Sequence, residues 1–81
     1  MPDSILKLLT PAEETVLALA GQGMSVKETA NFLVIAQDTV KTHRKHILAK
    51  TKCRSMTHVF GVLLQEEKER NNVQPAASSV S

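Results

Sequence analysis

The sequence predicts a small all-α domain of four helices. Two capping-box patterns, Thr10 to Glu13 and Ser25 to Glu28, stand close together near the N-terminus. Aliphatic residues recur at helical spacing along most of the chain. The 81 residues include two Phe and no Trp or Tyr, so the core must be aliphatic. A chain of this length forms one domain.

The first predicted helix covers about residues 11–20. Thr10 can cap its start, and Glu13 completes the capping box. Gly21 and Gly23 follow, and glycine readily adopts the left-handed conformation that closes a helix. Together these signals predict a short helix with both ends marked.

The second predicted helix covers about residues 26–33 and follows the second capping box. Its buried stripe consists of Val26, Ala30 and Leu33. A tight turn at 34–36 follows, and we expect Ile35 within it to point inward.

The third predicted helix runs from about 37 to 52 and has two distinct faces. At about 100° per residue, one face gathers Val40, Ile47, Leu48 and Thr51. The opposite face gathers Asp38, Lys41, Thr42, Lys45, Ala49 and Lys52. The first of these faces is predicted to be core, and the second to be exposed.

The fourth predicted helix starts after a Ser55 cap and runs to about Glu69. Its apolar residues span an arc of about 200°, although a helix packed on one side needs an arc of only ~100° or a little more. The surplus edge consists of Thr57, Gly61 and Leu64, where small residues would let a second helix approach. This pattern predicts a dimer contact, and the alternative is a well-covered core helix.

The positive charge gathers in the middle of the chain, although the net charge is only +2. Residues 25–54 carry seven Lys and Arg against two carboxylates, a net charge of +5. Residues 1–24 sum to −2 and residues 55–81 to −1. A polyanion would therefore bind the middle third.

Two short helices joined by a tight turn, with the second one basic, are typical of a helix-turn-helix. On the exposed face of the third helix, Lys can reach guanine acceptors and Thr can meet a thymine methyl group. A solvated charged face is the alternative for this helix taken alone. The preceding helix and turn favour DNA binding.

A set of residues over about 8–65 resembles the DNA-binding domain of LuxR/FixJ-type (GerE-like) regulators, with a NarL-type third helix. These residues are Leu9, Thr10, Pro11, Glu13, Val16, Leu17, Gly23, Ser25, Lys27, Glu28, Ala30, Leu33, Ile35, Thr39, Val40, Lys41, His43, Ile47 and Lys50.

The resemblance implies a domain over 9–70, preceded by an N-terminal arm at 1–8 and followed by a disordered tail at 71–81. It also implies a homodimer, joined through the fourth helix, that binds double-stranded DNA as a transcription factor. The implied base contacts are Lys41, Thr42 and Lys45. The implied phosphate contacts are Ser25, Lys27, Thr39, His43 and Lys50.

Three departures from the family pattern bear on DNA affinity. Ala36 stands where a Ser usually begins the recognition helix, so a capping or phosphate-binding hydroxyl is absent. The residues at 51–53, Thr-Lys-Cys, replace a Leu-Gly-Val-like stretch, and Met56 replaces a common Arg.

Other functions fit the sequence less well. The chain is too small for a credible enzyme, and Cys53, its only cysteine, excludes an internal disulfide. His43, His46, Cys53 and His58 lack the spacing of a zinc site, so we expect neither a metal nor a cofactor. The absence of a leader or a membrane-length apolar run predicts a cytoplasmic, nucleoid-associated protein.

Two alternatives to a self-standing DNA-binding regulator remain. One is region 4 of a sigma factor, which shares the first two helix patterns but has more Arg along its third helix. The other is an antagonist that pairs through the fourth helix, as a heterodimer, with a larger LuxR-type regulator. The retained Lys41, Thr42 and Lys45 favour direct DNA binding.

Overall fold

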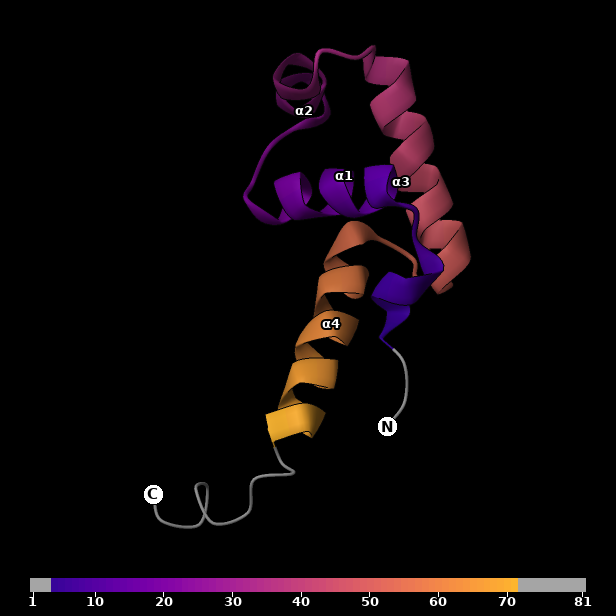
Figure 1. The fold of residues 1–81 in the computed structure, drawn as a ribbon, viewed down its shortest axis with the longest axis vertical. Coiled ribbons are helices and arrows are strands. Elements are labelled where there is room, and N and C mark those ends of the chain that lie inside the picture. The colour runs from indigo at the N-terminus through magenta and orange to yellow at the C-terminus, as the bar shows by residue number, and fades with distance from the viewer. Residues whose placement is uncertain (1–3, 72–81) are drawn as a thin grey trace.

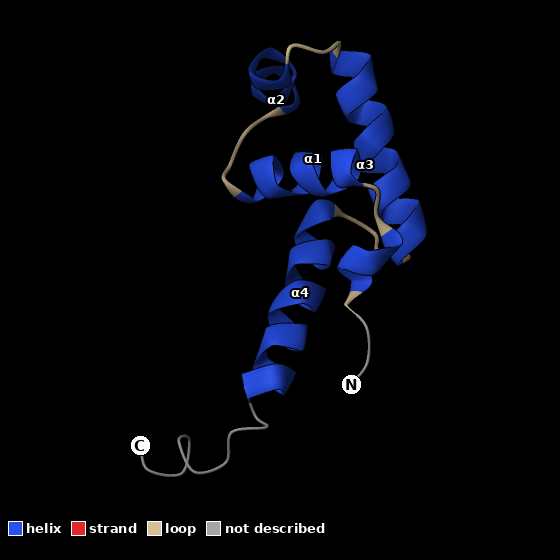
Figure 2. Cartoon of the chain, in the orientation of Figure 1, coloured by secondary structure: helices blue, strands red, loops and turns tan. Residues whose placement is uncertain are grey.

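The computed structural model describes residues 4–71 and contains only helices and loops in that range (Figures 1 and 2). A short 3-10 helix, η1 (Ile5–Leu8), precedes four α-helices. These are α1 (Pro11–Gly21), α2 (Val26–Leu33), α3 (Gln37–Thr51) and α4 (Met56–Asn71). The predicted all-α, four-helix fold is confirmed.

The core lies where α3 meets the other helices, because α3 contacts η1, α1, α2 and α4. Val16 of α1, Val40 and Ile47 of α3, and Val59 of α4 are almost completely buried. Burying one such side chain contributes about 1.5–3 kcal/mol. These buried side chains therefore hold α1, α3 and α4 together.

Both predicted capping boxes form. At the start of α1, the Glu13 amide donates to Thr10 Oγ1 (3.2 Å) and the Thr10 amide donates to Glu13 Oε1 (2.9 Å). Ser25 and Glu28 make the same two bonds at α2, at 3.1 and 2.9 Å. These bonds satisfy amides that a helix start otherwise leaves unpaired.

The turn between α2 and α3 depends on Val34, which adopts the left-handed conformation (φ 58°) and closes α2. The next amide, that of Ile35, donates to the Ala30 carbonyl oxygen (3.0 Å). Ile35 remains 36% exposed, so the expectation that it points inward is wrong. Instead of joining the core, it lines a hollow bounded by α1, the end of α2 and the start of α3.

The boundaries of α3 and α4 differ slightly from those predicted. Ala36 caps α3 without a side-chain hydrogen bond, and the helix ends at Thr51 because Lys52 is left-handed (φ 57°). Ser55 Oγ accepts a bond from the His58 amide (3.1 Å), as its predicted capping role requires. The last residue of α4, Asn71, lies two residues beyond the predicted end.

The segment predicted as an N-terminal arm is partly helical and bound to α4. Ser4 Oγ donates to Glu66 Oε1 (2.7 Å), and the Ile5 amide donates to Glu66 Oε2 (3.0 Å). Figure 1 shows this N-terminal segment beside α4. Glu66 thus joins the two ends of the described chain.

No helix within residues 4–71 has both the length and the apolar character needed to cross a membrane. The predicted disordered tail, apart from Asn71, lies outside the described residues.

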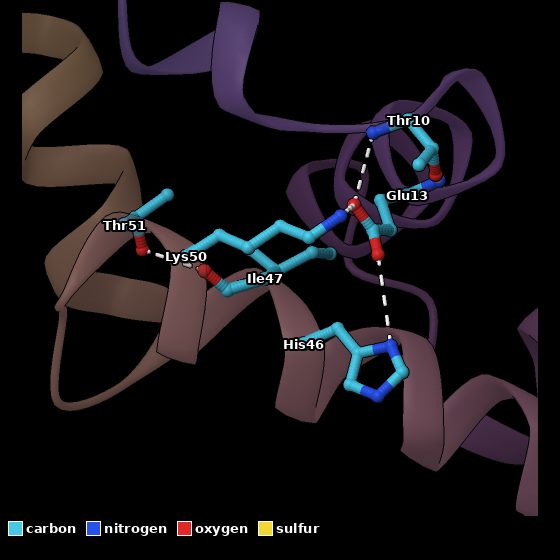
Figure 3. Close-up of polar contacts among 6 residues, drawn as sticks. All are labelled: Thr10, Glu13, His46, Ile47, Lys50 and Thr51. Carbon is cyan, nitrogen blue, oxygen red and sulfur yellow. Dashed lines mark hydrogen bonds and ion pairs between the residues drawn. The ribbon is translucent and has the colours of Figure 1, made fainter.

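A buried carboxylate joins α1 to α3 (Figure 3). The side chain of Glu13 is only 4% exposed. Its Oε1 accepts from Lys50 Nζ (2.8 Å), and its Oε2 lies 3.7 Å from His46 Nδ1. The hydrogen bonds from Lys50 and from the Thr10 amide outweigh the effect of burial and hold the pKa of Glu13 below its ordinary value of 4.5.

The Glu13→Gln variant tests this contact. Loss of the charged acceptor should cost about 1.5–3 kcal/mol of unfolding free energy at pH 7, the range for hydrogen bonds to charged groups. Because the folded-state pKa of Glu13 is lowered, its ionisation stabilises the fold above pH 4.5. That stabilisation is lost as the pH falls through the lowered value.

Urea unfolding at pH 7 and pH 3 measures both effects. The gap between wild type and Glu13→Gln should shrink at pH 3, while exposed Glu14→Gln should stay within about 0.5 kcal/mol of wild type. If wild type and Glu13→Gln differed in unfolding free energy by the same amount at both pH values, the stabilising role of ionised Glu13 would be contradicted.

Lys52 gives a second test, because a side chain at positive φ is strained and glycine is not. Lys52→Gly should raise the unfolding free energy by about 0.5–1 kcal/mol. Ala49→Gly, at an exposed position inside α3, should lower it by about 1 kcal/mol. Thermal unfolding of both variants measures these changes. If Lys52→Gly and Ala49→Gly lowered the unfolding free energy equally, strain at Lys52 would be excluded.

Candidate nucleic-acid interface

The side of α3 that faces away from the core is exposed and basic. Lys41, Thr42 and Lys45 are all exposed there, whereas Val40 and Ile47 on the opposite side have no exposed surface. The two predicted faces of α3 are therefore confirmed. We call Lys41, Thr42 and Lys45 the outer face of α3.

On one side of this face, α3 lies against the start of α1. Thr10 and Glu13 of α1 line a shallow groove together with residues of α3. The α3 residues in this groove are Asp38, Thr39, Thr42, His43 and His46. Thr42 therefore belongs both to the outer face and to the rim of the α1–α3 groove.

On its other side, α3 faces the first half of α4. A second groove there is lined by Arg44 together with the end of α1 and with α4. Arg44 is only half-buried, so this flank is also cationic at the surface.

The predicted phosphate-binding residues are spread over α2 and α3. Ser25 caps α2, and Lys27 is exposed in the first turn of that helix. Thr39 is exposed and His43 is half-buried, and both line grooves between α1 and α3. These positions could each meet solvent or a ligand, and their predicted phosphate contacts stay predictions.

Lys50 differs from the other predicted phosphate contacts because it already has a partner. Its ammonium donates to Glu13 Oε1 at 2.8 Å, and its side chain is 39% exposed. The charge of Lys50 therefore stabilises the α1–α3 contact. A phosphate contact by Lys50, which remains untested, would have to share the ammonium with Glu13.

The sequence pattern around Glu13 indicates only its role at the helix start and not its contact with Lys50. The two residues are separated by 37 positions, so no local spacing indicates the pair. Glu66, which holds Ser4 and Ile5, was missed for the same reason.

The predicted dimer edge of α4 is exposed. Leu64 is 57% exposed, and Thr57 and Gly61 are also exposed. A Cβ atom added at Gly61 would meet nothing within 4 Å. This edge adjoins the groove that α4 forms with the end of α1, so an apolar side chain and a hollow lie side by side.

The described residues, 4–71, hold no group of three His, Cys, Asp or Glu side chains that could bind a metal ion. Cys53 is a half-buried free thiol. The exposed groups of the outer face of α3 are two ammonium groups and a hydroxyl, whose chemistry is to bind anions and hydrogen-bond acceptors.

Comparisons with known proteins agree with this geometry. The family model for bacterial regulatory proteins of the luxR family matches residues 7–63. The nitrate/nitrite response regulator protein NarL of Escherichia coli strain K12 is 47% identical over 47 residues, covering 58% of this chain and 22% of that protein. Nodulation protein W of Bradyrhizobium diazoefficiens is 36% identical over 57 residues, covering 70% of this chain and 25% of that protein.

A third relative, the uncharacterized response regulatory protein YgeK of Escherichia coli, is 45% identical over 42 residues, covering 52% of this chain and 29% of that protein. The matches thus cover about a quarter of the length of these relatives. No solved structure matches the chain significantly.

The family match covers η1's end, all of α1, α2 and α3, and the first half of α4, which are the elements that present the outer face of α3. The chain therefore belongs to the luxR family of bacterial regulatory proteins, and carries the helix-turn-helix DNA-binding domain of a transcription regulator, not an enzyme.

Proposed function

We propose that the chain binds a two-fold repeated DNA sequence as a homodimer, with α3 of each copy in a major groove. One observation carries the proposal. Within residues 4–71, Lys41 and Lys45 are exposed and form no ion pair, whereas Lys50 on the same helix pairs with Glu13. The fold therefore leaves the charges of the outer face available for a ligand.

The outer face suits the major groove chemically. Lys41 and Lys45 can donate to guanine O6 and N7, and the methyl group of Thr42 can contact a thymine methyl group. The three residues span little more than one turn, so they would read adjacent base pairs. These contacts would supply sequence preference, which phosphate contacts cannot provide.

Phosphate contacts would supply salt-sensitive affinity. Ser25 Oγ accepts a bond from the Glu28 amide, which leaves its hydroxyl hydrogen free to donate to a phosphate. Lys27 stands in the same first turn, where the helix dipole also favours an anion. Thr39 and His43 would approach the backbone from the α1 side of α3.

A two-fold repeat requires a paired protein. The exposed edge formed by Thr57, Gly61 and Leu64 would supply the contact, because a C₂ interface uses the same patch on both copies. The open space at Gly61 would let a second α4 approach closely.

Two observations keep the antagonist alternative in view. Ala36 starts α3 without a side-chain cap or hydroxyl, and Lys50 is engaged with Glu13. Both would lower affinity for phosphates. A chain of this kind could pair through α4 with a larger regulator of the same family and withhold it from DNA.

Selection of bound duplexes from a random library, at moderate salt with competitor DNA, tests the proposal. Wild type should recover a shared motif arranged as a two-fold repeat. Lys45→Ala should relax base preference at one position of each half-site and cost about 1–3 kcal/mol of binding free energy. Lys68→Ala, an exposed change on α4, is the control and should recover the wild-type motif.

Two outcomes would count against DNA reading by α3. If folded wild-type protein recovers nothing above background, the antagonist function is favoured. If Lys45→Ala binds every site variant as wild type does, the outer face does not read bases.

Gly61→Glu tests the dimer contact. A charge at this open position should weaken self-association at least about tenfold, or ~1.4 kcal/mol, while the fold is spared because glutamate favours helix more than glycine does. Sedimentation equilibrium measures the association, with exposed Ala18→Glu on α1 as the control for added charge. An unchanged monomer–dimer equilibrium would exclude this edge of α4.

A further inference from the structure

The only carboxylate on α3 is Asp38, which is exposed in the first turn of the helix. It lies three, four and seven residues before Lys41, Thr42 and Lys45, so it shares their side of the helix. A face proposed to approach a polyanion thus includes one negative charge.

Asp38 has no partner within the described part of the chain. No hydrogen bond or ion pair joins it to Lys41, one turn away, or to any other residue in 4–71. It does not serve as the helix cap either, since Ala36 occupies that position without a side-chain bond. The carboxylate oxygens therefore keep their full capacity to accept hydrogen bonds.

Asp38 also lies beside a residue of the outer face. Asp38 and Thr42 line the same shallow groove between α1 and α3. In a helix-turn-helix, the N-terminal residues of the recognition helix are those that contact base edges. Asp38 would therefore meet the base pair next to the one that Thr42 contacts.

A carboxylate in the major groove discriminates sharply among bases. The exocyclic amino group of cytosine is a donor, and Asp accepts from it. Guanine presents two acceptors in that groove, and thymine presents a carbonyl oxygen and a methyl group. Asp38 would attract the amino group and repel the acceptors, and repulsion of wrong partners is an effective source of specificity.

The nearby phosphates repel the same carboxylate. Without a donor from a base, Asp38 would only lower the affinity for all DNA. A matched donor offsets that repulsion at one base step, whereas a mismatched sequence keeps all of it. Because Asp38 has no partner in the free protein, nothing in the protein offsets its charge. The difference in affinity between matched and mismatched DNA is therefore largest.

We propose that Asp38 is a specificity-determining residue that accepts a hydrogen bond from the exocyclic amino group of a cytosine beside the base pair contacted by Thr42. The proposal rests on the proposed entry of α3 into the major groove.

The experiment repeats the random-library selection with wild type, Asp38→Asn and Asp38→Ala, and with exposed Gln37→Ala as the matched control. Wild type should show a cytosine at one position of each half-site. Asp38→Asn should move that preference to adenine, because an amide pairs with adenine N6 and N7. Asp38→Ala should lose the preference at that position only, and Gln37→Ala should keep it.

Fluorescence anisotropy on the recovered DNA site then measures how much the contact between Asp38 and the cytosine contributes to binding. Exchanging that cytosine for thymine should weaken wild-type binding about tenfold or more, and should change Asp38→Ala binding less than twofold. Circular dichroism melts of the variants confirm that each compared protein is folded.

The outcomes separate the two proposals. A wild-type motif that depends on Lys45 but is unchanged by both Asp38 variants, with only a uniform rise in affinity, overturns the role of Asp38 and leaves the proposed function standing. Failure of wild type to select any motif overturns both.

Discussion

The structure depends on one buried carboxylate, that of Glu13. A charge taken out of water is costly unless it is fully hydrogen-bonded. Here the Thr10 amide and the Lys50 ammonium both donate to it, and His46 lies beside it. Lys50 and His46 belong to α3, so the carboxylate fixes the rotation of α3 against the start of α1. Turning α3 by a single residue, about 100°, would break this contact.

The same rotation decides which side chains face outward. With Lys50 held by Glu13, Val40 and Ile47 point into the core and Lys41 and Lys45 point to solvent. Glu13, in the first turn of α1, therefore also orients the helix proposed to bind DNA. Fold and function are joined at this point, although they use different lysines.

Local sequence patterns predicted what is locally determined. The two capping boxes marked the starts of α1 and α2, and the 3.6-residue period separated the faces of α3, because both are encoded within a few residues. The contacts of Glu13 with Lys50 and of Glu66 with Ser4 join residues 37 and 62 positions apart. Long, flexible side chains leave no periodic trace of such pairings. The position of Ile35 follows from the left-handed conformation of Val34. No spacing rule predicts that conformation for a β-branched residue, so the sequence could not indicate where Ile35 lies.

The division of charges on α3 explains how so small a domain can combine a stable fold with an open binding face. Lys50 and His46 lie near the buried carboxylate of Glu13, on the flank toward α1. Lys41 and Lys45 lie on the opposite side from the core and pair with nothing in residues 4–71. A substitution on the outer face can therefore change binding without removing the contact between α1 and α3, whereas a change at Glu13 would disturb both. The two roles are separable on α3 because its faces are separable, and they meet only at the rim of the α1–α3 groove.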